Sequence, residues 1–272
     1  MPSKETSDIT FLMVGCQRCG TTWTDAALRE HPEVFLPEAK QSYFFDRNYE
    51  KGINWYLERF RGADQRHRAV GEIATGYCLP HAIPKMAEHF PHVKLLMVMR
   101  NPVERAYSNY QSRRAESNWS TFEEAIESDS DLLKRGQYID QIEELLTHYD
   151  EGQLLFLLYD DLHANDKKYL ESVLLFLGVD PQTESSMIGQ RKNASMFPHL
   201  RKKLHQCGLK PLVSRLSKSW VGDKIRRSRK TKGQSYLPMH QETKLKLMKH
   251  FRPYNEKLSK FLGRDLSHWN AI

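Results

Sequence analysis

Short apolar segments recur along the chain and predict β-strands at residues 10–15, 69–73, 93–99 and 153–159. The last two segments are apolar at almost every position, which is typical of parallel strands that are covered on both faces. The segment at 69–73 carries the weakest signal of the four. The pattern therefore predicts a sheet whose central strands are buried and parallel.

Stretches with helical signals alternate with these strands. Residues 21–31 follow a glycine and end before a proline, and residues 102–114 begin with a proline, which is favoured in the first turn of a helix. Apolar side chains at helical spacing predict further helices at 137–149, 167–177 and 241–262. Alternating strands and helices are typical of βαβ units, so we expect one α/β domain with an open, doubly wound parallel sheet flanked by helices.

Length and composition agree with a single domain over residues 1–272. A chain of 272 residues buries roughly three quarters of its unfolded surface and needs no disulfide or metal to hold its core. The aromatic content of 11% excludes a disordered chain. No apolar run is long enough to span a membrane, and the polar first eight residues do not resemble a signal peptide. We therefore expect a cytoplasmic protein without a membrane partner, whose four cysteines are reduced thiols.

The balance of charge suggests an anionic ligand. The chain carries 41 Lys and Arg against 34 Asp and Glu, a formal net charge of +7. A basic segment at residues 191–234 includes the run RRSRKTKG at 226–233. Its charge fits a nucleic-acid patch, a membrane-surface patch, a flap over an anionic ligand or a solvated loop, and does not decide between them.

The loop after the first predicted strand has the pattern of a phosphate site. It runs from Gly15 to Gly20, and the helix that follows begins with Thr21 and Thr22. The Gly-x-x-x-x-Gly spacing by itself is common. A strand, this loop and a helix in succession, however, direct backbone N–H groups and a helix N-terminus toward a phosphate. The context therefore indicates a nucleotide phosphate site.

The side chains of this loop argue against ATP. ATP-binding loops carry lysine directly after the second glycine, where it reaches the β- and γ-phosphates, but this chain has Thr21 there. The basic side chain of the loop is Arg18, so a nucleotide without a γ-phosphate fits better. Cys16 and Cys19 form a Cys-x-x-Cys pair, but no second pair of ligands accompanies them, and we expect no metal.

A second candidate phosphate contact follows the predicted strand at 93–99. Arg100 stands at the end of this strand, where open α/β sheets bind their ligands. Ser108 lies about two turns along the next helix. A guanidinium group and a hydroxyl group that converge on one phosphate form a clamp. Taken separately, strand-end arginines also form salt bridges, and helix serines are usually solvated.

The two motifs together resemble those of sulfotransferases that use 3′-phosphoadenosine 5′-phosphosulfate (PAPS). The run QRCGTTW at 17–23 is similar to the family's 5′-phosphosulfate loop, and LMVMRNPVERAYS at 96–108 is similar to its 3′-phosphate motif. Matches at 43–46, 51–56 and 262–269 extend the resemblance over nearly the whole chain, and it is closest to the heparan-sulfate-type and bacterial branch. The resemblance implies a P-loop-type sheet and transfer of a sulfuryl group to a hydroxyl or amine.

The resemblance also implies roles for individual residues. Arg18 would neutralise charge on the leaving oxygen, where many relatives carry lysine. Because arginine does not deliver a proton as lysine does, we assign it electrostatic stabilisation. Two residues of the basic segment would cover the cofactor, which favours the flap interpretation. The predicted cofactor contacts are Arg18, Cys19, Gly20, Thr21, Thr22, Trp23, Arg100, Ser108, Lys232 and Gly233.

The general base is where the sequence departs from the family. Heparan-type relatives carry a catalytic glutamate where this chain has Gln41, and an amide does not accept a proton near neutral pH. Glu72, Asp46 and Glu116 are the candidate replacements, and an acceptor nitrogen that needs little help is a fourth possibility. We take Glu72 as the candidate catalytic base. We expect Gln41, Tyr43 and Asp46 to contact the acceptor.

The sequence thus predicts a PAPS-dependent sulfotransferase that acts on a small-molecule acceptor, with natural products and glycans as candidate classes. One alternative is a P-loop kinase or ATPase, which Thr21 disfavours. Another is a nucleic-acid-binding protein that uses the basic run, although no named RNA or DNA motif accompanies that run. We expect no nucleic-acid partner, and the pattern indicates no particular oligomeric state.

Overall fold

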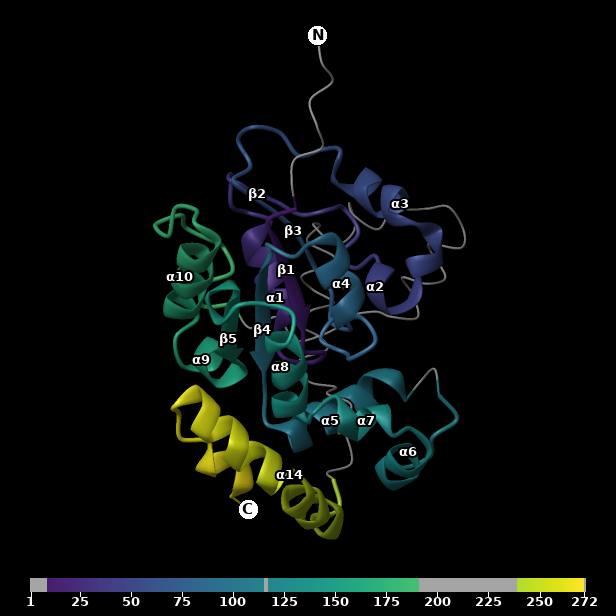
Figure 1. The fold of residues 1–272 in the computed structure, drawn as a ribbon. Helices are drawn as coiled ribbons and strands as arrows, with labels where there is room; N and C mark the ends of the chain where they lie inside the picture. Colours follow the sequence, from purple (N-terminus) through teal and green to yellow (C-terminus); the bar gives the residue numbers. More distant parts are fainter. Residues whose placement is uncertain (1–8, 115–116, 191–238, 272) are drawn as a thin grey trace, which may run out of the picture. The chain divides into compact units, whose positions relative to one another are not determined.

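Five parallel strands form one sheet in the order β2-β3-β1-β4-β5 (Figure 1). The computed structural model describes residues 9–114, 117–190 and 239–271, which belong to one compact unit. The central strand β1 pairs with β3 on one side and with β4 on the other. The strands are β1 (Phe11–Gly15), β2 (Val34–Phe35), β3 (Ala69–Ile73), β4 (Lys94–Met99) and β5 (Leu154–Leu158).

The four strands predicted from apolar segments are all present, each within one residue at either end. Strand β2 has no counterpart among the predictions, because two residues carry no periodicity. It pairs with β3 through Val34 opposite Ala69 and Phe35 opposite Val70. The predicted α/β class, with an open parallel sheet flanked by helices, is therefore confirmed.

Helices connect the strands, and the five helices predicted from boundary signals and periodicity all occur. The helix α1 ends three residues before its predicted end, because the N–H groups of Glu30 and His31 bond to carbonyls three residues back, as in the tighter turns that end helices. The described helices are α1 (Thr21–Leu28), α2 (Phe44–Arg47), α3 (Ile53–Leu57), α4 (Ile83–His89), α5 (Pro102–Arg113), α6 (Phe122–Ser128), α7 (Asp131–Lys134), α8 (Tyr138–Leu146), α9 (Tyr159–Ala164), α10 (Asp166–Leu177) and α14 (Gln241–Leu262).

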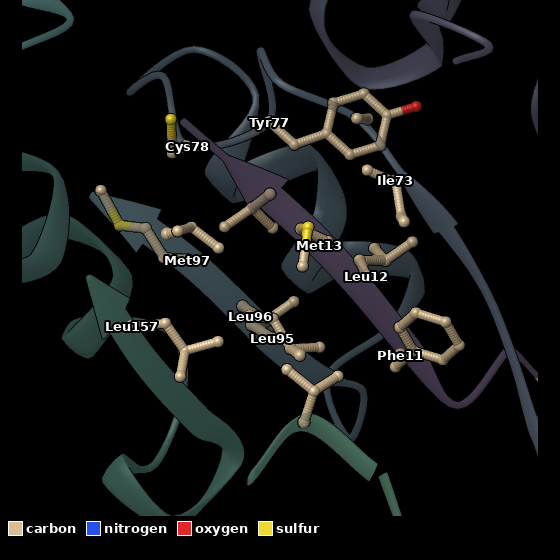
Figure 2. Packing of buried hydrophobic residues seen from close by; sticks show 14 of the residues in the cluster. Phe11, Leu12, Met13, Ile73, Tyr77, Cys78, Leu95, Leu96, Met97 and Leu157 are labelled. Atoms are coloured by element: carbon tan, nitrogen blue, oxygen red, sulfur yellow. The ribbon is translucent and has the colours of Figure 1, made fainter. Parts of the chain in front are cut away.

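The central strands supply a continuous hydrophobic core. Every residue of β1 is buried, and so is every residue of β4 after Lys94. Figure 2 shows side chains of this core from adjacent strands, among them Leu12 and Met13 of β1 and their register partners Leu95 and Leu96 of β4. Because both faces of these strands are covered, their sequences lack the apolar–polar alternation of a half-exposed strand. The core therefore holds the central strands in a fixed position beneath the loops that follow them.

A second hydrophobic cluster fixes helix α5. Val103 and Ala106 of α5 share this cluster with Leu247 and Phe251 of α14, together with side chains from α6 and α7. The long helix α14, drawn in yellow in Figure 1, thus returns from late in the sequence to pack on α5. This packing sets the orientation of the helix that carries Ser108.

The carboxyl ends of three strands carry the candidate phosphate contacts. Strand β1 ends at Gly15 and leads into the loop at 16–20, β3 leads to Thr75 and Gly76, and β4 leads to Arg100. Because the strands are parallel, their carboxyl ends meet at one edge of the sheet. That edge is the place where a doubly wound sheet binds its ligand.

Some predictions fall on parts of the chain that the structure does not describe. The basic segment at 191–234, with Lys232 and Gly233, is one such part, and Glu116 lies in another. Of the helices in the described ranges, none is both long enough and apolar enough to cross a membrane.

Gly71→Ala tests the close approach of β1 and β3. Gly71 is the register partner of Phe11, and a methyl group on it would lie 2.2 Å from the Phe11 carbonyl oxygen. Since the strands must move apart, we expect the free energy of unfolding in urea to fall by about 1–3 kcal/mol. Gly152→Ala is the control, because its methyl group would meet no atom within 4 Å. Equal stability of the two variants would contradict the prediction.

Candidate active site

The loop at residues 16–20 ends in a glycine that the fold requires. Gly20 precedes the first turn of α1 with a φ of 89°, a conformation that side chains disfavour. A methyl group there would also lie 2.8 Å from Leu162 and 3.0 Å from Tyr159. Helix α1 then begins at Thr21, and the first N–H groups of a helix have no partner inside it. The local structure is therefore the strand–loop–helix arrangement predicted from the sequence, and its binding of a phosphate stays a prediction.

The side chain of Arg18 joins the two predicted phosphate motifs. Its Nε donates a hydrogen bond to the Ser108 hydroxyl at 3.0 Å, and a terminal nitrogen reaches the Ser112 hydroxyl at 3.5 Å. In return, the Arg100 guanidinium group donates to the Arg18 carbonyl oxygen at 3.5 Å. Groups that are 82 and 90 positions apart in the chain thus lie within hydrogen-bond distance. The loop and helix α5 are therefore in direct contact, although Arg100 and Ser108 do not line the pocket described below.

Three contacts hold Arg100 at this edge. Its guanidinium group pairs with Glu104 at 2.8 Å and lies 4.8 Å from the centre of the Tyr159 ring. The buried Tyr138 hydroxyl, from α8, donates to the Arg100 carbonyl at 2.8 Å and also lies 3.9 Å from the sulfur of Cys19. The side chain of Asn101 caps α5 directly after Arg100 by accepting from two backbone N–H groups. The arginine therefore forms the expected salt bridge and also faces the loop.

A pocket of about 310 Å³ opens beside the loop. The predicted residues Arg18, Thr21 and Thr22 line one part of it, and the segments that follow β2 and β3 line another. One carboxylate, that of Asp46, also lines it. The basic residues in the lining are Arg18, Lys40, Arg47, Arg113 and Arg135. Five cations against one carboxylate favour an anionic or strongly polar ligand.

Lys40 contacts the threonines of α1. Its Nζ donates to the Thr21 hydroxyl at 3.3 Å and to the Thr22 hydroxyl at 3.1 Å. Burial, opposed by Asp25 and assisted by Arg29 and Arg18, lowers the pKa of Lys40 to about 8. The ammonium group is thus still protonated at neutral pH, and it lies where the sequence predicts a phosphate.

Asp46 is the carboxylate of the pocket. Its side chain is only 5% exposed, and its Oδ2 lies 3.5 Å from the Nε of Arg47. The buried Oδ1 accepts no hydrogen bond from any residue in the described ranges. A buried oxygen without a hydrogen bond is costly for stability, so it is a candidate for contact with a ligand proton.

The other two predicted acceptor contacts also line the pocket. The side-chain oxygen of Gln41 accepts from the Thr75 backbone N–H at 3.2 Å and from its hydroxyl at 3.0 Å, which connects the segment before α2 to the end of β3. Tyr43 is 38% exposed, and the Arg47 guanidinium group lies 5.0 Å from the centre of its ring. The structure thus places Gln41, Tyr43 and Asp46 in the lining of one pocket, and their contact with an acceptor stays a prediction.

Glu72, the predicted base, lies in a different environment. It is 0% exposed, and its carboxylate accepts hydrogen bonds from the Ser42 backbone, from the Ser42 hydroxyl at 2.9 Å and from the Tyr77 hydroxyl at 2.9 Å. Burial raises the pKa of Glu72, while these hydrogen bonds oppose the rise. Through the two hydrogen bonds from Ser42, the carboxylate fixes the segment around that residue. Its burial gives no support to contact with an acceptor, so the base role stays a prediction.

Two predicted cofactor contacts are buried in the core. Trp23 is 6% exposed, its indole N–H donates to the Met187 carbonyl at 3.2 Å, and its ring packs against Tyr169 of α10. Cys19 is 0% exposed, and with Cys16 and Cys78 it is a free thiol. Within the described ranges, no group of His, Cys, Asp and Glu side chains has an arrangement that could hold a metal ion. Any contribution of Cys19 to a ligand would come from its backbone.

The sequence reasoning missed Lys40 and Tyr138. Lys40 belongs to no motif, and only the path of the chain after β2 brings it to α1. Tyr138 lies within the helix predicted at 137–149, and nothing in the pattern shows that its hydroxyl lies beside both the loop and Arg100. A helix start, a strand end and a glycine loop are local signals, whereas these two contacts are long-range.

Comparison with known protein families shows which family the chain belongs to. The family model described as "Sulfotransferase domain" matches residues 8–261. The chain belongs to the sulfotransferase family. The resemblance that the two phosphate motifs indicated is therefore confirmed.

Curated relatives of this sulfotransferase include much longer proteins. It is 30% identical over 278 residues to human bifunctional heparan sulfate N-deacetylase/N-sulfotransferase 2. The alignment covers 93% of this chain and 29% of the human protein. It is 29% identical over 285 residues to the mouse bifunctional heparan sulfate N-deacetylase/N-sulfotransferase 4. This alignment covers 95% of this chain and 31% of the mouse protein. The sulfotransferase thus spans about three tenths of the length of these relatives.

Solved structures confirm the fold of the sulfotransferase. A sulfotransferase from Alicyclobacillus acidocaldarius superposes with a TM-score of 0.73 at 20% identity, covering 97% of this chain and 99% of the other. The sulfotransferase domain from the curacin biosynthetic pathway gives a TM-score of 0.50 at 13% identity, covering 96% and 100%. At these identities the similarity is one of fold.

The raised pKa of Glu72 predicts a pH-dependent stability. Between the ordinary carboxyl pKa of about 4.3 and the raised value, folded Glu72 keeps a proton that the unfolded chain has lost. The free energy of unfolding contributed by this group therefore falls as pH rises through that window. Urea unfolding at a series of pH values should show this fall in the wild type and not in Glu72→Gln.

The control for this experiment is Glu143→Gln, which replaces an exposed glutamate of α8. It should keep the pH dependence of the wild type. A Glu72→Gln protein with the pH dependence of the wild type would show that Glu72 does not titrate as its burial implies.

Proposed function

We propose that this protein transfers a sulfuryl group from PAPS to a hydroxyl or amine of a small-molecule acceptor. The single observation that carries the proposal is the hydrogen bond between Arg18 and Ser108, at 3.0 Å. It joins a loop suited to the 5′-phosphosulfate to a helix suited to the 3′-phosphate. A donor with phosphates at both ends of one adenosine fits this pair of motifs better than a nucleotide with a single phosphate chain.

The residues at the edge of the sheet fit such a donor in charge and in hydrogen bonding. Thr21, Thr22 and the first N–H groups of α1 would hold the 5′ end. Arg100 and Ser108 would hold the 3′-phosphate, which the proposal takes as the feature that distinguishes PAPS from ATP. Lys232 and Gly233 stay predicted contacts. The donor supplies the sulfuryl group, and the protein supplies position and positive charge.

The relatives suggest one class of acceptor. They are bifunctional heparan sulfate N-deacetylase/N-sulfotransferases, so an amine of a glycan is a candidate, alongside hydroxyl groups of natural products. The cationic and polar lining of the pocket suits acceptors of either kind better than an apolar one. A cytoplasmic location stays a prediction. Incubation with labelled PAPS and a metabolite extract, followed by mass analysis of labelled products, would identify the acceptor.

The geometry favours Asp46 over Glu72 as the group that takes the acceptor proton. Asp46 lines the pocket and has an oxygen with no hydrogen bond from the described residues, whereas Glu72 is enclosed by Ser42 and Tyr77. A base must lie within hydrogen-bond reach of the proton that it removes. Asp46 meets the condition of access to the pocket.

Asp46→Asn tests this role. Loss of a general base lowers turnover by roughly 10²–10⁴-fold, so we expect kcat with the identified acceptor to fall within that range. Affinity for 3′,5′-ADP should stay within about twofold, because the substitution is isosteric and leaves the phosphate contacts in place. Glu72→Gln serves as the comparison, and a larger loss of kcat in that variant would return the base role to Glu72.

Thermal-shift titration tests the donor. A ligand that binds only the folded state raises the melting temperature, so 3′,5′-ADP at about 100 times its Kd should stabilise the protein by about 2.7 kcal/mol, a shift of several degrees. Arg100→Ala should lower that affinity by about 10- to 100-fold, since it removes a charge-assisted contact. Arg66→Ala is the control, because Arg66 is 80% exposed and pairs with nearby Asp64.

The same titration separates the alternatives. Stabilisation by ATP with Mg²⁺ in preference to 3′,5′-ADP would overturn the proposal in favour of a P-loop kinase or ATPase. Stabilisation by a single-stranded oligonucleotide alone would favour nucleic-acid binding.

A further inference from the structure

Lys40 supplies a cation at the point where α1 begins. The segment that carries it follows β2, yet its Nζ lies 3.1 Å from the Thr22 hydroxyl and 3.3 Å from the Thr21 hydroxyl. The side chain lines the pocket. The threonine hydroxyls and the first N–H groups of α1 are the donors that would face a 5′-phosphate. An ammonium group among them completes an anion site with charge.

Arg18 is directed elsewhere. Its backbone has a φ of 72°, and its guanidinium group donates to Ser108 and Ser112 on α5. The loop's own cation therefore lies with the hydroxyls of the 3′-phosphate motif. The position of its side chain does not match the role at the leaving oxygen that the resemblance implies.

We propose, on the basis of the proposed function, that Lys40 is the cation of the 5′-phosphosulfate site and that Arg18 belongs to the 3′-phosphate site. Lys40 would thus contact the 5′-phosphosulfate of the donor, and Arg18 its 3′-phosphate. Lys40 would then supply, from the segment after β2, the positive charge that many relatives carry on a lysine of the loop itself. The pocket then binds each end of the donor with its own cation.

The division gives Lys40 a defined part in the transfer. The acceptor oxygen or nitrogen forms a bond to sulfur and loses its proton to Asp46, while the bond between sulfur and the 5′-phosphate oxygen breaks. The electron pair of the broken bond stays on that oxygen and adds a negative charge to it. Lys40 stabilises this charge electrostatically and keeps its own protons, so the step needs no further acid.

The charge of Lys40 suits this part. Burial, Arg29 and Arg18 lower its pKa to about 8, and Asp25 opposes them. A phosphate group beside the ammonium favours the charged form and raises the pKa again. Lys40 is therefore protonated at pH 7 with or without the ligand, and loses its charge in the free protein when the pH rises above about 8.

Two nucleotides with one phosphate each provide the test. Adenosine 5′-monophosphate has only the 5′ contact, and adenosine 3′-monophosphate has only the 3′ contact. We expect Lys40→Met to weaken binding of the 5′-monophosphate and of 3′,5′-ADP by about 10- to 100-fold, measured by calorimetry, because a charge-assisted contact is lost. Binding of the 3′-monophosphate should stay within about twofold. Ser108→Ala should give the opposite pattern.

Several outcomes would overturn the assignment. If Lys40→Met weakens both monophosphates equally, Lys40 only braces the loop, and if it weakens neither, Lys40 does not touch the ligand. Lys168→Met, on the exposed face of α10, is the matched control and should bind as the wild type does. If the wild type fails to bind 3′,5′-ADP at all, the proposed function fails, and this outcome is distinct from those two.

A pH series adds an independent readout. The affinity of the wild type for 3′,5′-ADP should decline between about pH 7 and 9, because the free protein loses the Lys40 proton in this range. Lys40→Arg keeps its charge throughout and should remove the decline while restoring binding at pH 7. Equal declines in the two proteins would assign the titration to another group and overturn the role of Lys40.

Discussion

The contact between the β1–α1 loop and helix α5 is the constraint on which the site depends. Arg18 bonds to Ser108, and Arg100 bonds back to the Arg18 carbonyl, so each motif fixes the other. The contact exists because β1 and β4 are adjacent parallel strands whose carboxyl ends open at the same edge. The second hydrophobic cluster, which joins α5 to α14, then keeps α5 in place. A segment near the end of the chain therefore supports a loop near its beginning.

Much of this architecture can be read from the sequence, because its signals are local. Continuous apolar runs predict β4 and β5. Helical periodicity with a terminal glycine predicts α14 with both ends correct. The phosphate loop was recognisable because a strand, a glycine and two threonines follow one another. Strand β2 was not, since Val34 and Phe35 are too few to show a period. Its place is set by pairing with β3.

The chemistry within the site was harder to predict, because it depends on which side chains point into the pocket. Glu72 and Asp46 are both acids near strand or helix ends, and the sequence gives no reason to prefer the one that the structure exposes to the pocket. Both are buried, but Asp46 lines the pocket whereas hydrogen bonds from Ser42 and Tyr77 enclose Glu72. Lys40 likewise acquires its neighbours from the tertiary path. Residue type indicates what a side chain can do, and packing decides where it does so.

The three thiols of Cys16, Cys19 and Cys78 lie buried beside the same loop. Each of these side chains is at most 3% exposed, while the cations Arg18 and Lys40 line the pocket. Alkylating reagents attack the thiolate of an accessible cysteine, so these sulfurs are shielded as long as the loop is closed over the core. Their rate of alkylation therefore measures how often the loop opens, and it reports local unfolding at the candidate active site.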